Sequence, residues 1–558
     1  MTDTPERVTV RVGATTWQLT PTPGQSVRAW LDTTRLRVRA SCGGTGGCGA
    51  CVIRLVSGSA NPLTRAEREK LTSEQQRQGY RLACQVRPVG SCLLELDDPA
   101  PLSPWRSLPA DELHPLDPHP SGGIPPQPLG VAPDSEGGGR GGRPDPHPLG
   151  VAVDLGTTHL RVSLWNRRHR LASRRGLNPQ SIHGADILNR LHEASRDPVR
   201  AEELSDLARQ AILGAITDMI ARDLGEGTSM LNRIGRMRIV GNTAMLILLA
   251  GAGAATLLDP DGWDTSLPCQ PDDPERWQTL WGLPNARIRL VAPVAGFIGS
   301  DLLACLLATR LIEQPPGSLL LDLGTNIEMA LWDGRSLHVA STPGGPAFEM
   351  SGIRHGLPGD AAGAVTHIDE VDGGPVFSTI GHGPPQGYCG TGLLDAVALL
   401  CRRQWVKPSG RFAMPVTETG LPLDPDQPAT AITSRDIDQF QRGKAACAAA
   451  IETLLGRAGF DWHHTTGLWL CGAFGAGLNI ANAQRLGLLP PLEGERIHKM
   501  AGAALAGCET ALLTPEESDP FSATRAAILP VSLATDEGFA DTFFRHLRLT
   551  SSPDGSIR

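Results

Sequence analysis

The sequence predicts a multidomain protein: a small α+β domain at the N-terminus, a linker rich in proline and glycine, and a two-lobed α/β domain beyond it. Three observations predict this fold class. The chain has 558 residues, too many for a single hydrophobic core. A glycine-rich segment with three closely spaced cysteines lies near the N-terminus. Two copies of one strand–turn pattern follow about 168 residues apart, which indicates two related lobes.

Domain boundaries are expected where the composition changes. Residues 1–99 form the small domain, 100–149 the linker, 150–316 the first lobe and 317–548 the second lobe. The linker contains stretches such as PSGGIPPQPLG and SEGGGRGGRPDP, which offer few apolar side chains to bury. We therefore expect a flexible, extended segment, whose length would let the small domain move relative to the two lobes.

Short strands and one helix are expected in the small domain. VTVRV and TTWQLT alternate in hydrophobicity on either side of Gly13–Ala14, which is the pattern of a hairpin. GQSVRAWLD has apolar residues at helical spacing. Further strands are predicted at CVIRLVSG, RLACQV and SCLLELDD.

A cysteine cluster is the strongest chemical feature of the small domain. Cys42, Cys48 and Cys51 share one glycine-rich loop, and Cys84 in RLACQ is the expected fourth ligand. Iron–sulfur clusters need thiolates and backbone N–H groups around their sulfurs, which such a loop supplies. The spacing C-x5-C-x2-C-x32-C resembles ferredoxins of the adrenodoxin type, which implies a [2Fe–2S] cluster in a ferredoxin-like (β-grasp) domain.

Two other interpretations of the cysteines stay open. A structural zinc site is the alternative to the cluster, although zinc sites usually offer two close cysteine pairs and this chain offers one. Cys92 is a nearby extra thiol, and we expect it to pack within a strand instead of binding metal.

Two turns of the α/β domain have the composition of phosphate-binding loops. VDLGTT and LDLGTN each place an Asp at the end of a buried strand before a Gly-Thr turn. One such turn also occurs in ordinary strand–turn structure, but here there are two, followed by the glycine turn CGAFGAG. The expected nucleotide-binding residues are Asp154, Gly156, Thr157, Thr158, Asp322, Gly324, Thr325, Asn326, Gly472, Phe474 and Gly475.

These three turns resemble the phosphate-1, phosphate-2 and adenosine motifs of the actin/hexokinase/sugar-kinase (ASKHA) superfamily. The resemblance implies a two-lobed actin-like ATPase with ATP as the nucleotide and Mg²⁺ near Asp154 and Asp322. A small-residue helix is predicted over 296–310, with Asp301 where a carboxylate can position the attacking water. Asp301, Asp154 and Asp322 are therefore the candidate catalytic residues, and an N-terminal helix cap is the alternative role for Asp301.

Taken together, the motifs resemble the reductive activators of corrinoid proteins, which join a [2Fe–2S] domain to an ASKHA ATPase. The resemblance also includes the blocks NPQSIHGADILNRL, VGNTAMLILLAG, GGPAFEMSGIRHG, YCGTGLLDAVA and CGAFGAGLNIANAQRLGLLP. It implies that the cluster delivers one electron to an inactive Co(II) corrinoid, returning it to Co(I), and that ATP makes this transfer productive. The implied partners are a corrinoid protein or corrinoid methyltransferase and an electron donor (a reductase, ferredoxin or flavodoxin), and we expect a homodimer.

The composition limits the other function classes. A net charge of −8 from 51 basic and 59 acidic residues, with no long run of either sign, argues against nucleic-acid binding. The sequence has no run of eighteen apolar residues and no apolar segment near its start, so neither a membrane span nor a secretory signal is expected. Twelve cysteines then indicate reduced thiols in a cytoplasmic protein.

Three alternative functions stay open at this stage. An activator of the 2-hydroxyacyl-CoA dehydratase type would ligate a [4Fe–4S] cluster from within its ATPase domain. A small-molecule kinase with a fused redox domain would need a sugar- or acid-binding pocket, which the sequence does not identify. A ferredoxin that only carries electrons would not need the three nucleotide motifs. Three residues have open roles: Glu349 contacts phosphate or partner, or is a buried turn carboxylate; Lys444 is solvated or contacts nucleotide; Thr391 stands where the family often has serine.

Overall fold

The computed structural model describes residues 8–19, 21, 24–34, 36–38, 44–97, 99–100, 104–114, 148–166, 169–183, 187–251, 253–259, 263, 267, 269–270, 273–324, 326–342, 348–350 and 352–550. Within this part of the chain, no helix is both long and apolar enough to cross a membrane. The predicted ligand Cys42 and the predicted phosphate-loop residue Thr325 lie outside the described residues.

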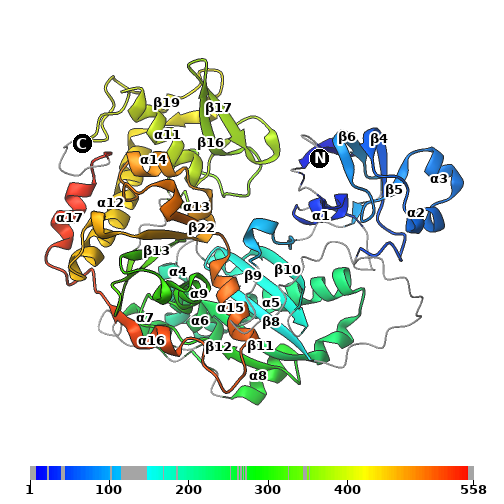
Figure 1. Ribbon diagram of the computed structural model, residues 1–558, viewed down its shortest axis with the longest axis horizontal. Helices are drawn as coiled ribbons and strands as arrows, with labels where there is room; N and C mark the ends of the chain where they lie inside the picture. The colour runs from blue at the N-terminus through cyan, green and yellow to red at the C-terminus, as the bar shows by residue number, and fades with distance from the viewer. Residues whose placement is uncertain are drawn as a thin grey trace.

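The N-terminal domain is built on a mixed sheet with short helices beside it (Figure 1). Its strand order is β2-β1-β6-β4-β5, and β1 pairs with β6 in parallel. The predicted hairpin is confirmed, since Val12 pairs with Thr15 across the turn. The elements are β1 (Val8–Val12), β2 (Thr15–Leu19), α1 (Val27–Asp32), β3 (Arg37–Val38), β4 (Val52–Ala60), α2 (Arg65–Lys70), α3 (Ser73–Arg77), β5 (Tyr80–Leu82), β6 (Pro88–Glu95) and β7 (Pro99–Ala100).

The first lobe has a mixed sheet in the order β10-β9-β8-β11-β12. Its central strand β8 reads LGVAVDL and is almost entirely buried, as expected for a strand covered on both faces. The elements are β8 (Leu149–Leu155), β9 (His159–Asn166), β10 (His169–Leu177), α4 (Ile187–Arg196), α5 (Pro198–Met219), the π-helical turn η3 (Ile220–Leu224), β11 (Ile234–Gly241), α6 (Thr243–Ala250), α7 (Ala254–Leu258), α8 (Pro274–Trp281), β12 (Arg287–Leu290) and α9 (Ser300–Thr309).

The second lobe repeats this topology. Its sheet runs β22-β21-β13-β14-β15-β23, so β15-β14-β13-β21-β22 matches the order of the first lobe. The predicted internal repeat of two related lobes is therefore confirmed. The elements of the sheet and its helices are β13 (Ser318–Leu323), β14 (Ile327–Trp332), β15 (Leu337–Thr342), α12 (Ser434–Arg457), β21 (Gly467–Cys471), α13 (Gly472–Gly477), α14 (Ile480–Arg485), β22 (Ile497–Met500), α15 (Ala503–Leu513), α16 (Ser522–Ala527), β23 (Ile528–Pro530) and α17 (Phe539–His546).

A smaller sheet extends the second lobe. It has the order β17-β16-β18 and carries helix α11 on the side of the main core. Figure 1 shows it at the edge of the lobe that lies nearest the N-terminal domain, where β2 lies beside the turn η7 (Ile380–His382). The elements are β16 (Ala364–Val371), β17 (Gly374–Thr379), β18 (Gly387–Tyr388), α11 (Gly390–Arg402), β19 (Leu421–Pro422) and β20 (Ala431–Ile432).

Helices α9 and α15 join the two lobes. They cross so closely that a Cβ on Gly507 would lie 2.0 Å from the carbonyl oxygen of Ala304. Although α15 follows β22 of the second lobe in sequence, it packs on β8 and β11 of the first. Leu505 and Leu512 of α15 share one apolar cluster with Ala152 of β8, so the lobes are connected through a common core.

Part of the predicted linker is folded. Residues 104–114 pack against the first lobe, and Trp105 is 8% exposed within its core. The backbone of Arg106 pairs with that of Arg175 in β10, with N–H···O distances of 2.9 and 2.7 Å. The expectation of a flexible segment throughout 100–149 is therefore wrong for 104–114, because Trp105 and Leu108 supply apolar surface that the proline and glycine content obscured. The remainder, 115–147, lies outside the described residues.

Candidate functional site

The glycine-rich loop brings predicted cluster ligands together. The sulfur atoms of Cys51 and Cys84 lie 3.4 Å apart, close enough to be ligands of one metal atom. The loop needs its glycines, since Gly44, Gly46 and Gly49 have φ values of 92°, 84° and 66°. Among the described residues no three ligating side chains converge on one point, and the predicted set includes Cys42, which lies outside them.

Backbone and side-chain donors surround these sulfurs. The backbone N–H of Ala50 donates to the sulfur of Cys48 at 3.5 Å, and Gln85 donates to that of Cys84 at 3.5 Å. The hydrogen bond with Cys84, together with burial, raises the pKa of Cys51. A buried group of cysteines with amide donors is the chemistry that an iron–sulfur cluster requires, so the residues present fit the cluster.

Cys92 lies in a different environment, as expected. It belongs to β6, is 6% exposed, and packs so tightly on β4 that a Cβ on Gly58 would lie 2.6 Å from its own Cβ. Burial raises its pKa to about 11, which keeps the thiol protonated. Its role is to fill the strand interface.

Both predicted phosphate turns are strand–turn–strand hairpins. Gly156 turns tightly between β8 and β9, where its N–H donates to the carbonyl of His159 at 3.0 Å and a Cβ would lie 2.6 Å from that oxygen. In the second lobe, the N–H of Gly324 donates to the carbonyl of Asn326 at 3.2 Å. Each hairpin presents its preceding aspartate at the end of a buried strand.

The three candidate catalytic carboxylates influence one another in the region between the two phosphate hairpins, which we call the cleft. Burial raises the pKa of Asp154, and burial together with the charge of Asp154 raises the pKa of Asp322 to about 6. Burial and the charges of Asp322 and Asp154 raise the pKa of Asp301 to about 7. Asp154 is buried, and Asp301 and Asp322 are half-buried, so three mutually repelling carboxylates lie close together, an arrangement that suits a divalent cation. Asp301 is not the N-cap of α9, which is Gly299, but its carboxylate accepts the N–H of Leu302 in the first turn at 3.0 Å.

A fourth carboxylate, Glu328, was missed by the sequence analysis. It lies in β14 directly opposite Asp322, is 3% exposed, and accepts the N–H of Gly299 at 3.0 Å. It also shares a hydrogen bond with Asp301, and burial with the charge of Asp301 raises its pKa well above the usual range. The sequence alone could have singled out Glu328 as a candidate site residue, because a glutamate is unusual in the otherwise apolar strand IEMALW.

The first phosphate turn contacts the second lobe. The hydroxyl of Thr158 donates to Glu349 at 3.1 Å across the cleft. Glu349 is exposed, so the alternative of a buried turn carboxylate is wrong. The hydroxyl of Thr157 is buried and accepts from Asn242 at 2.6 Å, which ties the turn to the N-terminus of α6.

The adenosine motif lies against the second phosphate strand. Gly472 has a φ of 76°, and a Cβ there would lie 2.7 Å from the carbonyl oxygen of Leu323. Phe474 stacks on Phe348 with ring centroids 4.6 Å apart and an interplanar angle of 18°. Gly475 is buried against Leu470 of β21. These contacts bring the loop at 348–350 and the adenosine motif together on one side of the cleft.

Two residues with open roles are structural. The hydroxyl of Thr391 donates to the carbonyl of Thr366 at 2.8 Å, which anchors α11 to β16. Lys444 is 1% exposed, and its Nζ donates to the carbonyls of His546 and Arg548 at 2.6 and 2.8 Å. Both alternatives for Lys444 are therefore wrong: it is neither solvated nor a nucleotide contact, because it holds the C-terminal segment on α12.

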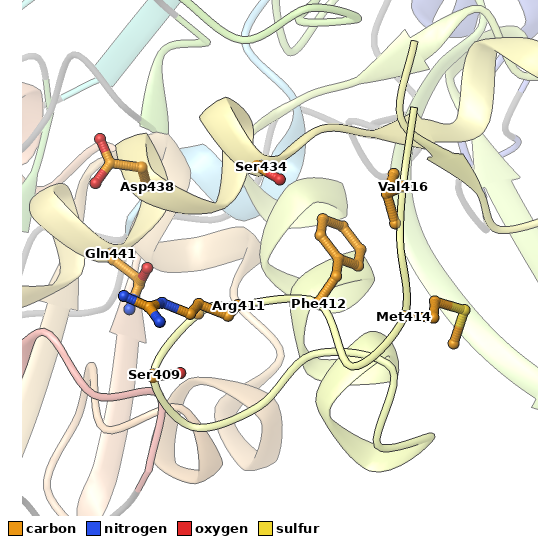
Figure 2. A pocket seen from close by; sticks show the side chains of 9 residues that line it. Ser409, Arg411, Phe412, Met414, Val416, Ser434, Asp438 and Gln441 are labelled. Atoms are coloured by element: carbon orange, nitrogen blue, oxygen red, sulfur yellow. The ribbon is translucent and has the colours of Figure 1, made fainter. Parts of the chain in front are cut away.

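A separate cavity of 430 Å³ lies outside this cleft (Figure 2). It is formed between the loop around Arg411 and Phe412 and the start of α12, where Ser434 and Asp438 line it. Figure 2 shows Arg411 beside Gln441 and Phe412 directed into the space below Ser434. None of the predicted cluster or nucleotide residues lines this cavity, so it is distinct from the candidate site.

Comparison with protein families decides the classification. Residues 149–314 match the RACo middle region, and residues 317–555 match the C-terminal domain of RACo, the ASKHA domain. The chain belongs to the reductive activators of corrinoid proteins. Residues 11–89 match the 2Fe-2S iron-sulfur cluster binding domain. An iron–sulfur cluster and a nucleotide are therefore the cofactors of this activator.

Relatives and solved structures agree with this family. The activator is 27% identical over 434 residues to the corrinoid activation enzyme RamQ of Eubacterium limosum, covering 71% of this chain and 69% of that one. It is 25% identical over 384 residues to the [Co(II) methylated amine-specific corrinoid protein] reductase of Methanosarcina barkeri, covering 61% and 66%. A solved reductive activator for corrinoid, iron-sulfur protein has the same fold, with a TM-score of 0.60, 23% identity, and coverage of 97% of this chain and 98% of that one.

Proposed function

We propose that this protein is an ATP-dependent reductive activator that returns a corrinoid protein from Co(II) to Co(I). One observation carries the proposal: a cysteine loop of the ferredoxin type and a two-lobed ASKHA cleft lie in one chain, and the lobes match the RACo models. A ferredoxin that only carries electrons has no use for the cleft. In an activator of the dehydratase type, the cluster is bound within the ATPase domain, so a separate cysteine loop would have no role.

Four cysteines would hold the cluster. We assign Cys42, Cys48, Cys51 and Cys84 as ligands of a [2Fe–2S] cluster, which when bound supplies one electron at low potential. The N–H of Ala50 and the amide of Gln85 donate to ligand sulfurs. Such hydrogen bonds, together with burial, set how strongly the reduced form is stabilised.

The cleft would bind Mg-ATP between its two hairpins. The backbone N–H groups of Thr157, Thr158 and Asn326 would donate to phosphate oxygens, whereas those of Gly156 and Gly324 stay bonded within their hairpins. Asp154 and Asp322, at the ends of the two phosphate strands, would hold Mg²⁺ or its water ligands. Asp301 orients the attacking water and accepts its proton, and Glu328 holds Asp301 in position through their shared hydrogen bond.

ATP acts on the protein conformation and not on the electron itself. The reduction balances as Co(II) plus one electron giving Co(I), with the electron supplied by an external donor. A nucleotide shifts such a reaction only when it binds one conformational state of the complex more tightly than another. We propose that closing of the lobes is sensed at the contact between Thr158 and Glu349, which joins the first phosphate turn to the second lobe. We further propose that the protein works in the cytoplasm, as a homodimer, with a reductase, ferredoxin or flavodoxin as donor.

The test is direct reduction of a corrinoid protein. The purified, anaerobic protein is mixed with dithionite and a corrinoid protein poised in the Co(II) state, and Co(I) is followed by its absorbance with Mg-ATP, with Mg-ADP and without nucleotide. We expect rapid formation of Co(I) only with Mg-ATP. Equal rates in all three mixtures would refute the proposal, as would phosphorylation of a small molecule without any reduction of cobalt.

A further inference from the structure

A short segment between the cluster domain and the first lobe contacts every folded part of the molecule. We call residues 104–114 the strap. On the first lobe, Trp105 is buried in the core and the backbone of Arg106 pairs with that of Arg175. On the second lobe, Arg106 forms an ion pair with Asp360 at 3.2 Å, and the ring of His114 bonds to the carbonyl of Ala501.

The strap reaches the nucleotide cleft through a chain of buried charges. Arg161 in β9 lies between two carboxylates, with Nη1 3.3 Å from Oδ2 of Asp154 and Nε 2.9 Å from Oε2 of Glu112. The other oxygen of Glu112 accepts from Arg175 at 2.7 Å. Burial raises the pKa of Glu112, but Arg161 and Arg175 lower it by more, so its carboxylate is charged. Glu112 thus fixes the guanidinium that contacts the proposed magnesium-binding carboxylate Asp154.

The other end of the strap reaches the cluster domain. The N–H of Ser107 donates to the carbonyl of Asp32, the last residue of α1, at 2.7 Å. The carboxylate of Asp32 in turn lies 3.1 Å from Arg222 of the first lobe. From the same helix, Arg28 donates to the carbonyl of Arg222 at 2.9 Å. A Cβ on Gly44 would lie 3.2 Å from Arg28, so this contact adjoins the cysteine loop.

The interface between the cluster domain and the first lobe is polar and contains buried donors without partners among the described residues. Among the residues that the structure describes, the apolar cluster of the cluster domain contains only residues between 8 and 96 and does not extend into the first lobe. The contact depends instead on ion pairs, and Arg37 is fully buried there with its Nε and Nη2 lacking a hydrogen-bond partner in the structure. A polar contact with unsatisfied donors is weak, so a modest free-energy input can shift it.

We propose that the strap couples nucleotide binding to docking of the cluster domain, with Glu112 as the positioning residue that connects Asp154 to Asp32. The inference depends on the proposed function, because it assumes that the cleft binds Mg-ATP. The structure combines a contact across the cleft with a docked cluster domain. In this coupling, nucleotide binding and docking favour each other, and by reciprocity anything that weakens docking also weakens nucleotide binding.

A double-mutant cycle on nucleotide affinity tests the coupling. Isothermal titration with the non-hydrolysable analogue AMPPNP and Mg²⁺ gives the Kd for the full-length wild type, Asp32→Asn, Glu112→Gln and the double variant. We expect Asp32→Asn to raise the Kd at least about threefold in the wild-type background and to leave it unchanged in the Glu112→Gln background, since the connection is already broken. The cluster spectrum checks that the N-terminal domain is folded in every variant.

Two further variants complete the design. Glu452→Gln removes a carboxylate that pairs with Arg545 and His546 far from the strap, so the Asp32→Asn effect should persist in this control background. Should Glu112→Gln fail to fold, Asp360→Asn breaks the contact of the strap with the second lobe at a partly exposed site and should reduce the Asp32→Asn effect. The inference would be overturned if Asp32→Asn left the Kd for AMPPNP unchanged or lowered it. It would also be overturned if Asp32→Asn changed this Kd by the same factor in every background. Absence of AMPPNP binding to the wild type would instead refute the proposed function.

Discussion

Phe348 and Phe474 stack on each other although 125 residues separate them in the sequence, with ring centroids 4.6 Å apart. Phe348 also contacts Phe440 of α12 edge-to-face at 5.9 Å. The three rings therefore connect the loop that carries Glu349, the adenosine motif and the long helix of the second lobe. This aromatic contact gives one side of the cleft a fixed shape before a nucleotide binds.

Replacing one of these rings should weaken nucleotide binding. In Phe474→Ala the stack is lost and the loop carrying Glu349 is released, so we expect the Kd for Mg-ATP to rise about tenfold, which corresponds to about 1.4 kcal/mol. Isothermal titration measures the change. The control is Phe544→Ala, which removes a ring that is 66% exposed on α17 and should leave the Kd unaltered.

The two thiols of the β5–β6 region should differ in their effect on the cluster. Cys84 lies 3.4 Å from Cys51, whereas Cys92 packs between strands. We expect Cys84→Ser to lose most of its iron and acid-labile sulfide, and Cys92→Ser to keep both. The dithionite-reduced proteins are compared by electron paramagnetic resonance, where wild type and Cys92→Ser should show the one-electron signal of a [2Fe–2S] cluster. Equal losses in the two variants would mean that the fourth ligand is misassigned, and zinc in place of iron in the wild type would rule out the cluster.

Much of this arrangement could be predicted from the sequence because its residues are local. The Asp at the end of a buried strand and the Gly-Thr turn that follows define each phosphate hairpin within six residues, and the hairpins at 149–166 and 318–332 are found as expected. The cysteine loop is equally local. Residue types and their spacing carried the predictions of these local structures, whereas the resemblance to known families supplied the cluster type and the nucleotide.

Contacts between distant segments could not be predicted in the same way. Nothing in the composition of the linker shows that Glu112 lies against Arg161, because the pair forms only when 104–114 folds onto β9 and β10. Lys444 has the spacing of a solvated helix residue, and only the packing of α17 and the residues after it buries it. Helices α2 and α3 were also missed, since they are short and depend on the capping residues Thr64 and Thr72.

The buried Lys444 should make stability depend on pH. Burial lowers its pKa to about 7, whereas in the unfolded chain it is about 10.5. Between these values the unfolded state binds more protons than the folded state, so this lysine makes the folded protein more stable as pH rises from 7, by up to about 1.4 kcal/mol per pH unit. We expect the melting temperature of the wild type to increase relative to that of Lys444→Met between pH 7 and pH 9. Parallel curves for the two proteins would contradict a neutral buried lysine.

The central claim is that the nucleotide cleft drives electron delivery by a separate cluster domain. Asp322→Asn tests it most directly, because the change removes a charge at the end of the second phosphate strand and leaves the cysteine loop intact. The matched control is Asp333→Asn, the same chemical change in the turn that follows β14. A second variant, Cys48→Ser, should lose electron transfer and retain measurable ATPase activity.

The decisive measurement is the rate of ATP-dependent Co(I) formation on a corrinoid protein by Asp322→Asn carrying an intact cluster. We predict that the cluster signal is unchanged, that ATP hydrolysis is lost, and that Co(I) formation falls to the rate seen without nucleotide, whereas Asp333→Asn keeps the wild-type rate. Activation by Asp322→Asn at the wild-type rate would contradict the account.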